Sequence, residues 1–193
     1  RQNISGGGVK TSALGFGGFV PPGNTITGAT ESWNDTSWSN KPDLGTPRKS
    51  LGVAGVSNSS ILGFGGDTFT GTRQQALTEA WNGTAWSEVA DLNTARFVLG
   101  GTGTKSAALA FGGYDFNPNV TAKTEQWNET CWTNKNDMNT ARYNLAGSGT
   151  VSAALGFGGN TGPSAITEQW NGSSWTEVAD LNAGRSDLAG CGT

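Results

Sequence analysis

The sequence contains no histidine, only two cysteines and few charged residues. Charged residues make up 14% of its 193 positions, and the formal net charge is −3 at pH 7. Without histidine the chain cannot form a Ser/His/Asp triad, a Cys/His nucleophile pair or an HExxH zinc site. The weak negative charge supplies no basic field for nucleic acid or an anionic membrane. We therefore expect no nucleic-acid partner, and the missing histidine argues against an enzyme.

Long apolar runs are missing as well. No stretch approaches the roughly 18 consecutive apolar residues of a membrane span, so we expect no membrane insertion. Cys131 and Cys191 are too few for a disulfide scaffold or a Cys-only zinc site, and we expect two small buried thiols. We expect no metal and no cofactor. A start at Arg1 without Met indicates a processed product or a fragment.

A fourfold repeat marked by tryptophan organises the chain. Hydrophobic residues reach only 34%, yet the sequence has eight Trp and 31 Gly. Every Trp belongs to a pair: Trp33 and Trp38, Trp81 and Trp86, Trp127 and Trp132, Trp170 and Trp175. A Gly-Gly doublet after Leu-x-Phe recurs in step, and so does an arginine, at Arg1, Arg48, Arg96, Arg142 and Arg185. Periods of about 40 to 50 residues are typical of propeller blades or helical repeats.

Local signals favour strands over helices. Gly, Thr and Asn are poor helix formers, and no repeat shows an apolar stripe of helical period. The last full repeat predicts strands over residues 142–149, 152–157, 166–170 and 175–179. The segment between each pair of Trp residues begins with Asn, in two copies as Asn-Gly, which is typical of a tight hairpin. The two Trp of a pair should therefore face each other on adjacent strands.

The order of these features resembles the kelch repeat. Each copy has Gly-Gly, a variable loop, Thr-Glu-x-Trp-Asn, a second Trp, an apolar residue and an Arg. The likeness covers four copies and essentially the whole chain. One departure is the first Trp of each pair, where kelch units usually have Tyr. The Gly- and Thr-rich, closely similar copies also look like the kelch-like repeat arrays of marine phage and bacterial surface proteins. The resemblance implies an all-β, kelch-type β-propeller built of four-stranded antiparallel blades.

We expect one β-propeller domain over residues 1–193. Its repeats are placed at about 1–47, 48–95, 96–141 and 142–184, and residues 185–193 supply an extra first strand. This strand either completes the N-terminal blade by strand exchange, with Arg1 to Lys10 displaced, or begins the next blade of a larger propeller. The narrow, Gly-rich first strands favour a four-bladed ring.

The repeated charged residues could be taken for an active site, but they occupy equivalent positions in every repeat, which argues against one. Each repeat carries a Glu two residues before its first Trp and an Asp just before the later apolar residue: Glu31, Glu79, Glu125, Glu168, Asp43, Asp91, Asp137 and Asp180. Catalytic carboxylates need different environments at one place, whereas these recur in equivalent surroundings. We expect structural roles for these carboxylates, with the arginines bridging to a carboxylate or to carbonyls.

The segments after the Gly-Gly doublets differ between copies, and they should emerge on one face of the propeller. Loops on a rigid scaffold commonly carry recognition. The candidate ligand-binding residues are Phe19, Phe69, Arg73, Tyr114 and Phe116. The same side chains could instead cover the rim of a blade.

Three hypotheses follow. The first is a non-enzymatic structural or adhesive module, displayed on a virion as a tail fibre or capsid decoration, or on a bacterial surface, and binding a host or cell-surface glycan or protein. A homo-oligomer or a virion assembly fits this hypothesis. The second is an intracellular kelch adaptor for a partner protein. The third, an enzyme of the galactose-oxidase type, would hold copper through Tyr and His ligands, and the absence of His opposes it.

Overall fold

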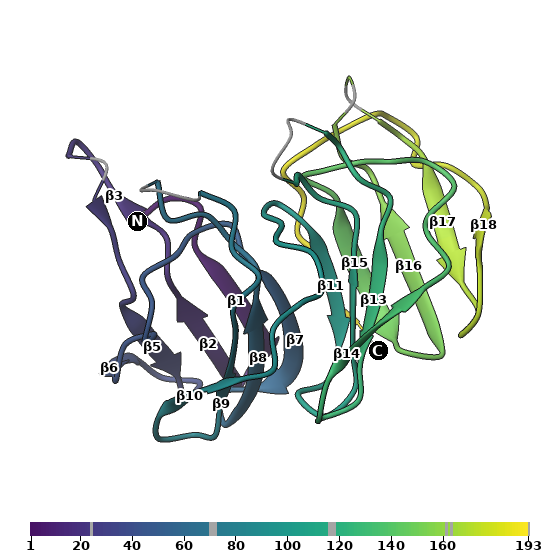
Figure 1. The fold of residues 1–193 in the computed structure, drawn as a ribbon. Coiled ribbons are helices and arrows are strands. Elements are labelled where there is room, and N and C mark those ends of the chain that lie inside the picture. The colour runs from purple at the N-terminus through teal and green to yellow at the C-terminus, as the bar shows by residue number, and fades with distance from the viewer. Residues whose placement is uncertain (24, 70–72, 116–118, 161, 163, 193) are drawn as a thin grey trace.

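The structure, a computed structural model, describes all residues except 24, 70–72, 116–118, 161, 163 and 193. The described residues form strands and no helix. Four sheets contain four antiparallel strands each, and a small hairpin pairs β3 (Phe19–Val20) with β4 (Thr25–Ile26). The sheets are the blades of a four-bladed β-propeller (Figure 1), which confirms the predicted all-β architecture.

In each blade the strands follow chain order from the axis outward. Blade 1 contains β1 (Ser5–Val9), β2 (Ser12–Phe16), β5 (Thr30–Trp33) and β6 (Trp38–Lys41). Blade 2 contains β7 (Gly52–Ser57), β8 (Ser60–Phe64), β9 (Thr78–Trp81) and β10 (Trp86–Val89). Blade 3 contains β11 (Gly100–Gly103), β12 (Ala108–Phe111), β13 (Thr124–Trp127) and β14 (Trp132–Lys135). Blade 4 contains β15 (Ala146–Thr150), β16 (Ala153–Phe157), β17 (Thr167–Trp170) and β18 (Trp175–Glu177).

The inner strands begin later than the sequence predicts. In blade 4 the prediction placed a strand over 142–149, whereas β15 starts at Ala146. The reason is a backbone turn just before it, where Asn144 has a φ of 52°. A non-glycine residue with positive φ cannot continue an extended strand. The residues before this turn instead direct the Arg142 side chain into the blade, where it is fully buried.

In blades 2, 3 and 4, tryptophans pack each blade against the one before it. The two Trp of a pair face each other across the hairpin, with ring centroids 5.5 to 5.7 Å apart. The second Trp also packs against the Phe of the preceding blade, at 4.8 Å for Trp86 and Phe16 and 4.9 Å for Trp132 and Phe64. Its indole N–H donates to a Thr hydroxyl of that blade, as Trp132 does to Thr78 at 3.1 Å. The sparse apolar residues are therefore concentrated where blades meet.

The Gly-Gly doublets allow the backbones of neighbouring blades to approach closely. Gly65 has a φ of 67°, and a Cβ atom on it would lie 2.5 Å from the carbonyl oxygen of Arg96. The next glycine, Gly66, donates its N–H to that same carbonyl at 2.8 Å. Only glycine fits this left-handed, crowded position without strain.

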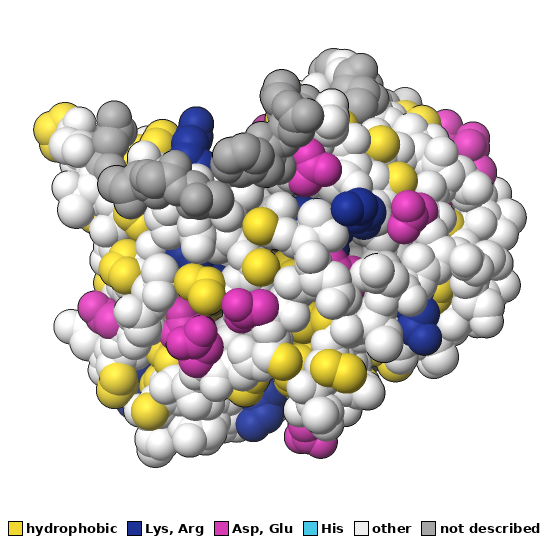
Figure 2. All heavy atoms as spheres, in the orientation of Figure 1, with side chains coloured by type: hydrophobic (Ala, Val, Ile, Leu, Met, Phe, Trp, Pro, Cys, Tyr) yellow, Lys and Arg dark blue, Asp and Glu magenta, His cyan; other side chains and the backbone are white. Residues whose placement is uncertain are grey.

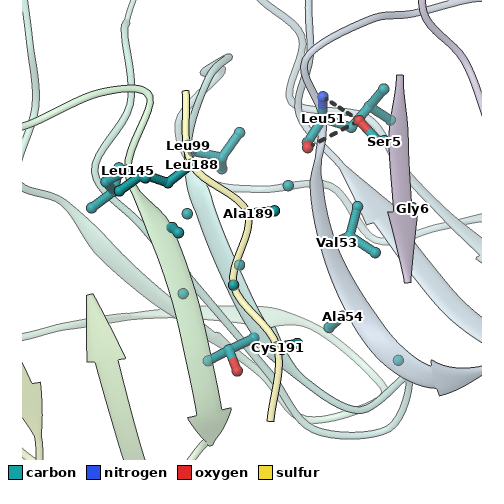
Figure 3. A pocket seen from close by; sticks show the side chains of 18 of the residues that line it. Ser5, Gly6, Leu51, Val53, Ala54, Leu99, Leu145, Leu188, Ala189 and Cys191 are labelled. Atoms are coloured by element: carbon teal, nitrogen blue, oxygen red, sulfur yellow. Dashed lines mark hydrogen bonds between the residues drawn. The ribbon is translucent and has the colours of Figure 1, made fainter. Parts of the chain in front are cut away.

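Residues 185–192 lie beside β15 along the axis, as Figure 3 shows for Leu188 to Cys191. Asp187 donates its N–H to the carbonyl of Asn144 at 3.1 Å, and Gly192 accepts from the N–H of Gly149. The N-terminal residues are not displaced, because β1 pairs with β2 inside blade 1. The expectation of buried thiols was wrong: Cys131 lies in the turn between β13 and β14 and Cys191 lies on this edge segment, and both are exposed.

Candidate functional site

The candidate site is the end of the propeller where the loops between second and third strands emerge, the upper end in Figure 1; we call it the loop face. Here the residue after the repeated Arg forms a β-bridge with the residue after the Gly-Gly doublet. The bridges are Gln2 with Phe19, Lys49 with Asp67, Phe97 with Tyr114, and Tyr143 with Asn160. The backbone repeats from blade to blade while the side chains differ, so the loop face combines a rigid frame with variable chemistry.

Three aromatic rings from blades 3 and 4 form an aromatic cluster on the loop face. Tyr114 lies between the other two, with ring centroids 5.7 Å from Phe97 and 4.8 Å from Tyr143. The Tyr114 and Tyr143 rings meet edge to face, a favourable geometry for aromatic pairs. All three side chains are half-buried, so the cluster is packed and still reachable from outside.

A charged cluster occupies the corresponding part of blade 2. The Asp67 side chain is fully buried, and its Oδ2 lies 2.8 Å from Arg73 Nη2 and 3.7 Å from Lys49 Nζ. Its Oδ1 accepts the backbone N–H of Phe69 at 2.9 Å. The Phe69 ring is 42% exposed, with Lys49 Nζ 3.8 Å from its centroid and Arg73 Cζ 4.9 Å away. Both cations are within the range of a cation–π interaction.

Electrostatics keeps the Asp67 carboxyl group ionised at neutral pH. Burial alone would raise the pKa of Asp67, but the Arg73 and Phe69 hydrogen bonds and the charges of Arg73 and Lys49 outweigh burial and lower it. The hydrogen bond to Asp67 in turn raises the pKa of Arg73. The carboxylate therefore fixes two cations around an exposed aromatic ring.

The predicted ligand-binding residues divide between these two clusters. Phe69 and Arg73 belong to the charged cluster, and the Phe19 ring lies 5.2 Å from Lys49 Nζ. Tyr114 lies in the aromatic cluster, and Phe116 lies outside the described residues. Four residues of the two clusters were not predicted from the sequence: Lys49, Asp67, Phe97 and Tyr143. Lys49, Phe97 and Tyr143 each directly follow a repeated Arg, at a position where the residue type varies from copy to copy. This variation could have identified them.

The repeated arginines lie inside the blades. Arg96 donates to the carbonyls of Gly112 and Lys123 at 2.8 and 2.7 Å and to Glu125 Oε1 at 2.9 Å. Arg48 pairs with Glu79 and Arg142 with Glu168 at 2.8 and 3.0 Å. Burial lowers the pKa of these guanidinium groups and the partner carboxylates oppose that shift; a guanidinium stays protonated in proteins. Arg185 is exposed instead.

The axis carries a channel of about 540 Å³, lined by the inner strands and by residues 187–192. Its wall consists mainly of backbone and of small or aliphatic side chains, such as Val53, Ala54 and Ala189 (Figure 3). In Figure 2 the charged side chains are scattered over the visible surface without a large patch of one sign. The described part of the chain has no group of three or more potential metal-ligating side chains, nor a helix able to span a membrane.

Comparison with known proteins gives no relative from which a function could be transferred. No protein-family model matches the chain, and no curated protein matches its sequence. The geometry of the loop face therefore carries the functional conclusion.

Proposed function

We propose that this protein is a non-enzymatic binding module that recognises a host or cell-surface glycan through its loop face. The aromatic cluster of Phe97, Tyr114 and Tyr143 carries the proposal. It offers half-buried rings, held in place by one another, on which the apolar face of a sugar ring can stack. Two of the three rings also carry a hydroxyl that can donate or accept a hydrogen bond.

The charged cluster supports the same function. Asp67 holds Arg73 in position, and the exposed part of that guanidinium can donate hydrogen bonds to sugar hydroxyls. The low net charge of the chain suits a neutral ligand better than a polyanion. The absence of His from the sequence supports a role in binding rather than a His-dependent reaction.

For the location of this module we propose a virion, as a tail fibre or capsid decoration, or a bacterial surface. The resemblance of the repeats to the kelch-like arrays of marine phage and bacterial surface proteins supports this location. The hairpins and loops, rich in Thr, Asn and Gly, suit a polar, extracellular surface.

A protein ligand is the second candidate, and the exposed apolar side chains of the loop face favour it. Phe69 is 42% exposed and Val20, in the β3–β4 hairpin, is 45% exposed. Exposed aromatic side chains are common anchors in protein interfaces. A kelch-type adaptor would hold its partner through these residues.

A glycan array probed with the wild-type protein tests the proposal, together with Tyr114→Ala and Tyr143→Ala. Loss of one stacking ring should weaken binding about tenfold, corresponding to roughly 1.4 kcal/mol. Val9→Ala is the matched control, because Val9 is 52% exposed at the far end of β1, and its binding should not change. Retained binding by folded Tyr114→Ala and Tyr143→Ala would contradict the glycan site, and binding lost only with Phe69→Ala and Val20→Ala would favour the protein ligand.

A further inference from the structure

The contact between neighbouring blades is repeated three times in the chain, with the same partners each time. The following blade provides a Trp that packs on a Phe and donates to a Thr of the preceding blade, at 3.0, 3.1 and 2.9 Å. It also provides a Glu whose Oε2 accepts a backbone N–H from the preceding blade, at 2.7 Å in all three contacts. The following blade thus brings Trp and Glu, and the preceding blade brings Phe, Thr and an N–H.

Blade 4 has the Phe, the Thr and the backbone N–H that a preceding blade contributes to this contact. No described Trp or Glu of another blade meets them. Phe157 is only half-buried, whereas the equivalent Phe16, Phe64 and Phe111 are fully buried. Among the described residues, no donor reaches Thr167 Oγ1, the equivalent of the Thr hydroxyls that accept an indole N–H. The backbone N–H of Asn182, at the position of Asn93 and Asn139, likewise has no carboxylate acceptor in the described chain.

Blade 1 has the Trp and the Glu that a following blade contributes to this contact. No described Phe, Thr or backbone N–H of another blade meets them. Trp38 is 54% exposed, and its indole N–H meets no acceptor within the described residues. Glu31 binds Arg1 through Oε1 at 3.0 Å, while no described N–H donates to its Oε2. The two ends of the array therefore expose complementary groups, each of which has its partner at the other end.

Residues 185–192 run beside blade 4 at the position of a further inner strand, bonded to its backbone. Gly159 donates its N–H to the carbonyl of Arg185 at 2.9 Å, as Gly66 does to Arg96. The Arg185 side chain is exposed, and its one described hydrogen bond runs from Nε to the carbonyl of Ala183 at 3.4 Å. Buried equivalents such as Arg96 bind two carbonyls and a Glu of their own blade. Among the described residues, Arg185 therefore has no equivalent of the two carbonyls and the carboxylate that Arg96 binds.

The residues just before the inner strand of blade 1 are less buried than their equivalents in other blades. The side chains of Arg1 and Glu31 are 13% and 39% exposed, whereas those of Arg142 and Glu168 are fully buried. Ile4 is 48% exposed, while Leu99 at the same repeat position is 6% exposed. At the Arg1 and Ile4 positions, this segment therefore buries less side-chain surface than the equivalent residues of blades 3 and 4.

We propose that blade 1 of one copy of this chain docks on blade 4 of a second copy. Residues 185–192 of the second copy then serve as the inner strand of the docked blade, in place of β1. Arg185 binds the acceptors that Arg1 now uses, the carbonyls of Gly17 and Ala29 and the carboxylate of Glu31. Trp38 of the docked copy packs on Phe157 and donates to Thr167. Such a head-to-tail contact produces a closed ring or an open filament.

Light scattering coupled to size-exclusion chromatography over a wide range of protein concentrations tests the proposal. Wild-type protein should associate, and Trp38→Ala and Arg185→Ala should each weaken association by about tenfold or more. Phe69→Ala and Arg73→Ala are the matched controls, because they remove an exposed aromatic ring and an exposed guanidinium from the loop face. Circular dichroism should show that all four variants fold.

A mixing experiment identifies the head-to-tail geometry. Trp38→Ala keeps an intact blade 4 end and Arg185→Ala keeps an intact blade 1 end, so their mixture should form a heterodimer at a concentration at which each variant alone is monomeric. A monomeric wild type at every concentration would overturn the proposal, and so would association that both variants leave unchanged. Failure of the two variants to complement each other would also overturn it.

Discussion

Replacing Arg96 with methionine should be among the most damaging single substitutions in this protein. The Arg96 side chain is fully buried and the Glu125 side chain is 1% exposed. Methionine fills most of the space of the arginine stem but leaves the Glu125 carboxylate and the carbonyls of Gly112 and Lys123 without their donor. Breaking a buried ion pair by removing one partner costs about 3 to 5 kcal/mol. For a chain of this length the melting temperature should fall by about 6 to 20 °C.

Two matched substitutions show whether burial sets this cost. Arg185→Met removes an exposed arginine and should change the free energy of unfolding of the monomer by less than about 0.5 kcal/mol. Arg1→Met breaks the partly exposed pair with Glu31 and should cost about 1 kcal/mol or less. Urea unfolding of dilute protein, followed by Trp fluorescence, measures all three.

The double variant Arg96→Met/Glu125→Gln completes a double-mutant cycle. Because the neutral amide removes the uncompensated buried charge, the double variant should be less destabilised than the sum of the two single variants. The reasoning would be refuted if Arg96→Met cost no more than Arg1→Met, or if the two single effects simply added.

Two further predictions concern a glycine and a carboxylate. Gly65→Ala should cost about 1 to 3 kcal/mol, because its φ is 67° and the new Cβ would meet the Arg96 carbonyl at 2.5 Å. Gly162→Ala, with a φ of 93° but no described atom within 4 Å of the new Cβ, should cost less in the same urea assay; equal costs would contradict the role of crowding. Asp67→Asn should lower the free energy of unfolding by about 2 kcal/mol at pH 7. Because the native pKa of Asp67 is lowered, its stabilisation is complete above the unfolded pKa of about 3.9 and is lost as the pH falls through the native value. Urea titrations of both proteins across this range should therefore converge in acid, and a constant difference would contradict the ionised cluster.

The sequence predicted the architecture because its signals are local and repeated. Trp pairs around Asn-containing turns predict hairpins, and the Trp pairs do face each other in the structure. The Gly-Gly doublets recur in step with the Trp pairs, and Gly65 in one of them has a positive φ that suits glycine. Strand limits were less accurate, since nothing local to Asn144 indicates that its backbone turns before β15.

The site was predicted only in part, because its members come together from separate segments. The variable loops pointed to Phe69 and Tyr114, but Lys49 and Tyr143 precede the inner strands and reach the loop face only through β-bridges. A single sequence does not show which residue after an Arg will lie beside which loop. Sequence reasoning also placed Cys191 in a buried environment, whereas the chain leaves it on an exposed edge segment.

The sequence by itself determined the repeat, the strands and the residues available for each blade contact. The tertiary structure decided which of these contacts are made, because each one joins residues of two different blades. Trp132 and Trp38 occupy the same position in their repeats, yet the first is 4% exposed and the second 54%. The difference arises because Trp132 packs against Phe64 of blade 2, whereas no Phe of another blade packs against Trp38 within the described residues.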